Sequence, residues 1–177
     1  MNTVVPFILD ILKYTAAGTA VFFIAYSVLK NEIEKNRQMK EIELRKATLS
    51  TTLPLRLQAY ERVTLFIERM NPASLLVRSH TPGISVLQFQ QMLVSEVQNE
   101  FQHNVTQQVY LSVQAWTVVR RLKDDTISLI NNCARRMDMD SPSIELSKAV
   151  LAHLSVIEEN PYEAALTLIK ADLQDVI

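Results

Sequence analysis

The sequence predicts an all-α chain with one N-terminal transmembrane helix, a helical stalk, and a five- to six-helix bundle or short helical array. Three observations lead to this fold class. The 177 residues include only two glycines, so few positions suit tight hairpin turns. Apolar residues recur at helical spacing through most of the chain, and no strand-length alternation competes with that pattern. Capping residues and prolines at helix starts divide the chain into segments.

The first segment, residues 1–30, is the predicted transmembrane anchor. The run from Tyr14 to Leu29 contains no charged residue. As a helix it covers roughly 24 Å, which is less than the roughly 30 Å hydrocarbon core of a bilayer. Extending the helix back to Ile8 supplies the missing length and brings Asp10 and Lys13 into the segment. The lipid bilayer is therefore the first partner that the sequence predicts.

Asp10 and Lys13 lie three residues apart, on neighbouring faces of one helical turn. In one interpretation both side chains lie near a membrane surface, where Lys13 reaches toward water. In the other they form a charged pair inside the membrane, on an ion pathway or a subunit contact of an energy-coupled complex. The sequence favours the first interpretation and leaves the second open.

The charges around the anchor predict its orientation. Six basic residues follow it closely: Lys30, Lys35, Arg37, Lys40, Arg45 and Lys46. No basic residue precedes Lys13, so the positive-inside rule places the N-terminus outside and the C-terminal part in the cytoplasm. A cleaved signal peptide is the competing interpretation, but its basic region should precede the apolar run rather than follow it.

Small residues in the anchor suggest a face for helix packing. Thr15 with Thr19, and Ala16 with Ala20, are each four residues apart and allow close approach of a second helix. A homo-oligomer formed through this face is one prediction, and ordinary lipid-facing residues are the alternative.

Residues 31–52 are highly charged and predict a solvated helical stalk. No sustained heptad of apolar residues is apparent there, so a long coiled coil is not predicted. We expect the sequence Thr51-Thr52-Leu53-Pro54 to break the helix and to begin a separate all-helical domain, residues 53–177.

Within that domain, caps mark successive helices. Asn71-Pro72 begins a short helix to Val77, and Ser85 with Gln88 forms a capping box. Asn104 with Gln107 suggests a second capping box, and hence a break or kink. Further starts or breaks are expected at Lys123-Asp124-Asp125, at Ser141-Pro142 and at Asn160-Pro161.

Groups that carry chemistry are sparse, and we predict no metal, no cofactor and no catalytic residue. Glu96, Glu100 and His103 share one helical side, and Glu-x-x-His is half of a di-iron motif, but the second half is missing. The near-zero net charge argues against nucleic-acid binding.

Cys133 is the only cysteine, and a pair with His80, His103 or His153 is the single nucleophile–base arrangement to consider. The cysteine lies on an apolar helical stripe, where it usually acts as a small hydrophobic residue. We therefore expect a structural role for it.

The segment LPLRLQAYER, residues 53–62, followed by FIER at 66–69, resembles the signature of a family of uncharacterised bacterial proteins, and IELSK at 144–148 fits the same pattern. The resemblance implies an anchor followed by helices and supplies no catalytic residues. Positive and negative side chains both occur along this helix. The charged face is either solvated or a docking surface for a partner helix. The docking candidates are Arg56, Glu61, Arg62, Glu68 and Arg69.

Together these features predict a non-enzymatic, membrane-tethered scaffold or adaptor in the bacterial inner membrane, with an unidentified protein partner. The alternative is an accessory subunit of an energy-coupled membrane complex that uses Asp10 and Lys13.

Overall fold

In the computed structural model the backbone is described for residues 4–175, and the side chains for residue 9 and residues 12–175. The regular structure in this range is helical, as predicted. Its elements are α1 (Val4–Met70), α2 (Pro72–Arg78), α3 (Val86–Asn104), the 3-10 helix η1 (Val105–Val109), α4 (Val113–Ala134), α5 (Ser143–Ser155) and α6 (Pro161–Gln174). The chain divides into two compact units, Met1–Thr51 and Thr52–Ile177, which are described separately below.

The prediction that a new helix begins at Thr51–Pro54 was wrong, because α1 continues through Pro54 to Met70. A proline removes one backbone hydrogen bond and bends a helix, but long helical segments on both sides can maintain the helix through it. Thr51 Oγ1 also donates to the carbonyl oxygen of Ala47 at 3.1 Å, within the turn that precedes the proline.

The first unit is a helix whose described side chains are exposed or, at Ser27, intermediate. It is long and apolar enough to cross a membrane, and the mean hydropathy of its 18-residue apolar segment is 1.3. The apolar residues of this stretch include Val21, Phe22, Phe23 and Ile24, all of which are exposed.

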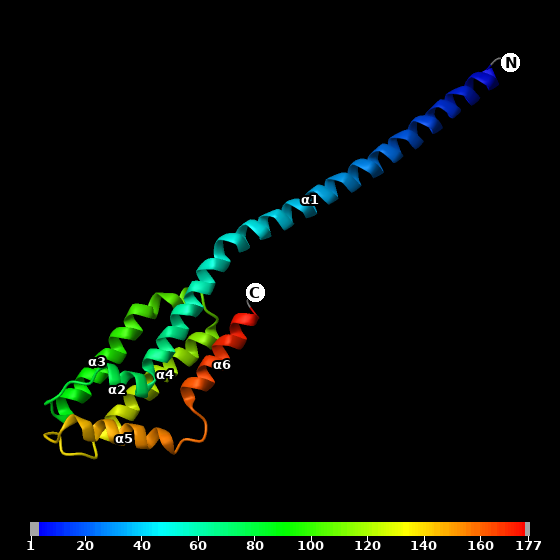
Figure 1. The fold of residues 1–177 in the computed structure, drawn as a ribbon. Helices are drawn as coiled ribbons and strands as arrows, with labels where there is room; N and C mark the ends of the chain where they lie inside the picture. The colour runs from blue at the N-terminus through cyan, green and yellow to red at the C-terminus, as the bar shows by residue number, and fades with distance from the viewer. Residues whose placement is uncertain (1–3, 176–177) are drawn as a thin grey trace. The chain divides into compact units, whose positions relative to one another are not determined.

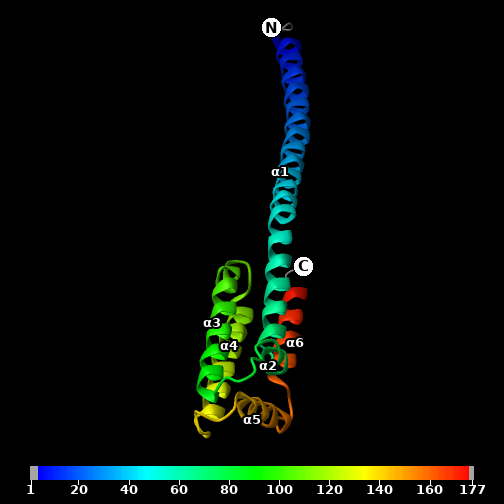
Figure 2. The ribbon, with the colours of Figure 1, turned by 60° about the vertical axis from the view of Figure 1, so that its left-hand side comes forward.

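The second unit is a helical bundle with one hydrophobic core. Helix α4 packs against α3, α5 and α6, and α3 also contacts α5 (Figure 1). Figure 2 shows α5 lying across one end of the bundle, and α6 beside the C-terminal part of α1. The largest fully buried side chains come from nearly every helix and include Tyr60, Phe66, Phe89, Ile130 and Ile169. Burial of these apolar groups is the main stabilising term of the unit.

The predicted capping box at the start of α3 is confirmed. Gln88 N donates to Ser85 Oγ at 3.4 Å, and Ser85 N donates to Gln88 Oε1 at 3.1 Å. The predicted short helix after Asn71 and the last helix after Asn160 are also present, and each asparagine accepts a hydrogen bond from a backbone N–H in the first turn.

The break near Asn104 is confirmed, but the capping box predicted there is wrong. Asn104 Nδ2 donates backward to the carbonyl oxygen of Glu100 at 2.8 Å, so this side chain caps no following helix. The chain continues as η1, and α4 begins only after Ser112, whose Oγ accepts from Ala115 N at 3.0 Å.

The break predicted at Lys123-Asp124-Asp125 was wrong, since α4 runs through it. The Lys123 ammonium lies 5.0 Å from the centre of the Phe101 ring and 2.6 Å from Asp124 Oδ1. On the core side, Leu122 and Thr126 are buried. The helix therefore continues through the charged residues, because buried residues next to them pack in the core.

Candidate functional site

The small residues of the predicted anchor packing face lie exposed along α1. Thr19 Oγ1 donates to the carbonyl oxygens of Thr15 and Ala16, at 3.0 and 2.9 Å. Thr15 Oγ1 donates to Leu12 O at 3.3 Å, and Ala16 and Ala20 present only methyl groups. Because the threonine hydroxyls are bonded within their own helix, this face is compatible with lipid or with a second apolar helix.

The Asp10 side chain lies outside the described residues, whereas Lys13 is described and exposed on α1. The interpretation of these two residues as a membrane-embedded pair therefore stays a prediction.

The five docking candidates on the C-terminal part of α1 separate into two groups. Arg56 Nε donates to the carbonyl oxygen of Tyr110, in the turn between η1 and α4, at 3.3 Å, and Arg69 forms an ion pair with Glu100 of α3. Both arginines therefore contact other parts of the same chain. Glu61, Arg62 and Glu68 are exposed. Leu65 is exposed among them, and these four residues are called the outer stripe of α1 below.

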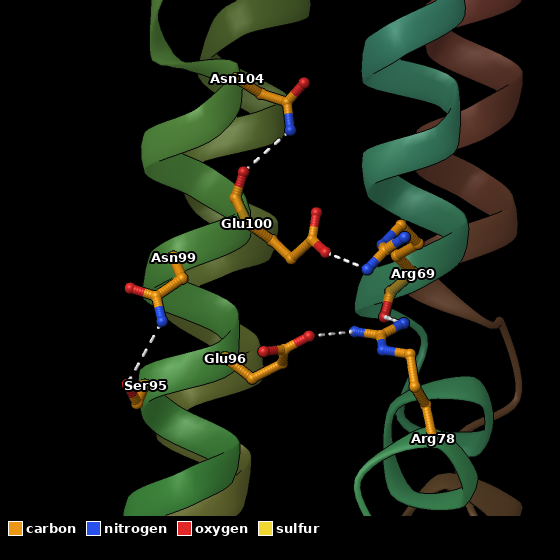
Figure 3. A network of polar contacts seen from close by, with 7 residues as sticks. All are labelled: Arg69, Arg78, Ser95, Glu96, Asn99, Glu100 and Asn104. Carbon is orange, nitrogen blue, oxygen red and sulfur yellow. Dashed lines mark hydrogen bonds and ion pairs between the residues drawn. The ribbon is translucent and has the colours of Figure 1, made fainter.

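A ladder of charged groups joins the ends of α1 and α2 to α3 (Figure 3). Arg69 pairs with Glu100, Arg78 Nη2 lies 3.1 Å from Glu96 Oε1, and Arg78 Nη1 donates to Arg69 O at 3.4 Å. Glu100 is the most buried of these carboxylates, with 15% side-chain exposure. Arg69 Nε is buried without a hydrogen bond to the described residues. The ladder positions α3 against the preceding helices, and its pairs are too exposed to contribute more than about 1 kcal/mol each.

The ladder also shows where the residues of the half di-iron motif lie. Glu96 and Glu100 each face an arginine, and His103 is exposed at the end of α3. Among the described residues no group of three or more His, Cys, Asp and Glu side chains is placed to hold a metal ion.

A second polar network joins α1, α4 and α6. Tyr60 OH donates to Asp172 Oδ2 at 2.5 Å, and Ser112 Oγ donates to Asp172 Oδ1 at 2.6 Å. Burial, and after it the hydrogen bond and charge of Asp172, raises the pKa of Tyr60 to about 12. A single carboxylate therefore holds a buried tyrosine and the N-cap of α4 together.

A smaller network closes the other end of α6. The hydroxyls of Thr126 and Tyr162 lie 2.8 Å apart, and Thr126 Oγ1 also bonds to Leu122 O at 2.7 Å. Burial raises the pKa of Tyr162 to about 12.

Cys133 and His153 line one hollow between α4 and α5, with a volume of about 600 Å³. Leu129, Met137 and Ala149 are among the other residues that line it. Burial raises the pKa of the Cys133 thiol, and the charge of Arg136 opposes this effect. The thiol is therefore protonated at neutral pH, which makes it a poor nucleophile.

The two remaining histidines lie elsewhere, since His80 lines a separate hollow at the start of α3 and His103 is exposed.

The fold defines a class: an all-α protein that combines a membrane-length N-terminal helix with a helical bundle. Among the described residues, Arg69 Nε is the one buried side-chain polar atom without a hydrogen bond. The chain belongs to a family of unknown function, DUF7935, whose model matches residues 6–176. No curated protein and no solved structure matches the chain.

Proposed function

We propose that the chain is a membrane-tethered assembly protein, a scaffold or adaptor that presents a helical bundle at the cytoplasmic face of the bacterial inner membrane. The observation that carries the proposal is the apolar stretch of α1. Phe22, Phe23 and Ile24 are 73, 70 and 64% exposed. Apolar side chains in such a continuous run require lipid or another protein around them, and the length of the helix suits lipid.

The proposed orientation follows from the basic residues after the apolar stretch. Lys30, Lys35 and Arg37 all lie close after Leu29, and the rule that cytoplasmic flanks are basic places them inside the cell. This arrangement puts the bundle in the cytoplasm and the first residues outside.

An assembly role is supported by the outer stripe of α1. Leu65 is 57% exposed and lies between Glu61, Arg62 and Glu68 at helical spacing. A large apolar group surrounded by both signs of charge is suited to packing against a partner helix, with the charges forming a polar rim. The proposed role needs no catalytic residue.

Two experiments test the proposal. The first is purification of the tagged full-length protein from gently solubilised membranes, followed by mass spectrometry and a native mass. A stoichiometric complex is expected, and recovery of a monomer alone contradicts an assembly role. If the outer stripe docks the partner, Leu65→Glu should abolish its recovery, while Val77→Glu should not. Val77 is a suitable control because it is 81% exposed but lies on α2.

The second experiment measures topology in intact cells with a membrane-impermeant maleimide. In a Cys133→Ser background, the cysteine of Thr3→Cys should be labelled in intact cells. The cysteine of Val77→Cys should be labelled only after the cells are permeabilised. Recovery of the protein in the soluble fraction, or the reverse labelling pattern, contradicts the proposed anchor or its orientation.

A further inference from the structure

The continuity of α1 through Pro54 reveals a row of positions that a break at this point would have interrupted. The row alternates spacings of three and four residues, as the a and d positions of a coiled coil do. Its members are Met39, Ile42, Lys46, Leu49, Leu53, Arg56, Tyr60, Val63, Ile67 and Met70. Eight of these ten residues are apolar or aromatic, and the first four are called the stalk seam below.

The two ends of the row differ in how well they are covered. Tyr60, Val63 and Ile67 are at most 1% exposed, because the helices of the bundle cover them. In the stalk seam, Met39, Ile42 and Leu49 are 57, 59 and 56% exposed. The same pattern of residues that forms a core in one unit is therefore uncovered in the other.

We propose that two copies of the chain pair through the stalk seam in a short, parallel, in-register coiled coil. This inference rests on the proposed function, because it requires that both copies are anchored in one membrane. The anchor gives each copy the same direction and sets the same number of residues between membrane and seam. Equivalent residues of two copies then lie at the same height, so Met39, Ile42 and Leu49 each meet their own counterpart.

The positions that flank the seam are compatible with a second copy. In a parallel pair, the residue before each a position approaches the residue five further along the partner helix. These contacts join Gln38 to Glu43 and Arg45 to Ser50 of the second copy, and neither contact opposes two like charges.

Lys46 is the one charged residue of the stalk seam, and it occupies an a position. A single lysine at such a position fixes register and strand number, although it lowers stability. Its aliphatic part can cover the seam while the ammonium group reaches water. Glu43 lies three residues earlier on the same helix, at a spacing that favours an ion pair. The seam is short, so pairing depends on the high local concentration that a shared membrane provides.

Disulfide cross-linking of the full-length protein in native membranes tests the pairing. In a Cys133→Ser background, Ile42→Cys and Leu49→Cys should cross-link to a second copy under mild oxidation. Leu44→Cys is the matched control, because Leu44 is 68% exposed and occupies the position opposite the seam. Strong cross-links at the two seam positions and weak ones at the control are expected. Equal cross-linking at all three positions, or none, overturns the proposal.

A second set of variants avoids dependence on the disulfide. Leu49→Lys removes burial from both copies, so it should weaken pairing by on the order of a hundredfold or more, while Leu44→Lys leaves it unchanged. Lys46→Leu should strengthen pairing. If Leu44→Lys and Leu49→Lys reduce the native mass equally, the seam is not the interface.

The outcomes separate this inference from the proposed function. A membrane-bound complex with a foreign protein and no seam cross-links retains the proposed function and overturns the pairing. Recovery in the soluble fraction overturns both.

Discussion

Tyr60→Phe tests the network that joins α1, α4 and α6. The change removes only the phenolic oxygen, which donates to Asp172 Oδ2 at 2.5 Å from a side chain that is 1% exposed. A hydrogen bond to a charged acceptor contributes about 1.5–3 kcal/mol. Asp172 keeps its bond from Ser112 and is only partly buried, so water can replace part of the lost contact. We therefore expect the free energy of unfolding to fall by about 1.5 kcal/mol.

The measurement is urea unfolding of the full-length protein in detergent, followed by the fluorescence of its single tryptophan. Trp116 stacks on Phe101 with ring centres 5.4 Å apart, so its emission reports the bundle rather than the anchor. Tyr110→Phe is the matched control, because the Tyr110 hydroxyl has no hydrogen bond among the described residues and should change stability by less than about 0.5 kcal/mol.

A double-mutant cycle with Asp172→Asn shows whether the loss comes from this hydrogen bond. Because the two groups are in direct contact, their effects should be coupled by at least about 0.5 kcal/mol. The reasoning is refuted if Tyr60→Phe unfolds at the same urea concentration as the parent, or if the two changes add without coupling.

Two further predictions concern charge. Burial raises the pKa of Tyr60 and Tyr162 from 10.0 to about 12, so the unfolded chain loses these protons first. Stability should be intact below pH 10 and fall as the pH rises toward 12, by up to about 2–3 kcal/mol per tyrosine, and Tyr162→Phe should reduce the fall. A urea midpoint that is constant over this range contradicts this account. In the ladder, Glu100→Gln should cost about 1 kcal/mol because Glu100 is the more buried carboxylate, at 15% side-chain exposure, and its loss unpairs an Arg69 guanidinium whose Nε already has no hydrogen bond to the described residues. Glu96→Gln should stay within about 0.5 kcal/mol, because Glu96 is 34% exposed. If the two variants lose the same free energy of unfolding in the urea assay, the predicted difference between the two ion pairs is wrong.

The sequence predicted the fold class and several helix starts because those features depend on local chemistry. The capping box of Ser85 and the cap of Asn160 involve residues two or three apart, and the structure contains both. The predictions were wrong where contacts between residues far apart in the sequence determine the local structure. Asn104 has a capping sequence but bonds backward, and Ser112 caps α4 while also bonding to Asp172, sixty residues later.

The polar networks show the same limit of prediction. In the sequence, Glu100 belongs to a metal-like motif and Arg69 is a docking candidate, but nothing in their spacing indicates that they pair. Asp172 lies in a helix with ordinary amphipathic spacing, and its partners are 112 and 60 residues away. A single sequence holds no signal for such contacts, because they depend on how the helices pack.

Pro54 links the error in helix assignment to the proposed pairing. A proline is a reasonable signal for a helix boundary, and treating it as one separates Leu49 and Leu53 from the core residues that follow. Once α1 is known to continue, the spacing that joins Leu53 to Tyr60 also reaches back to Met39. The helices of the bundle cover the part of this row from Tyr60 to Met70 within one chain. In the proposed pairing, the second copy of the chain covers the stalk seam. Met39, Ile42 and Leu49 continue the spacing of the core residues, and the proposed pairing gives these three side chains a common contact. Ile33 and Leu44 are exposed on the same stalk but lie off the row, so they take no part in that contact.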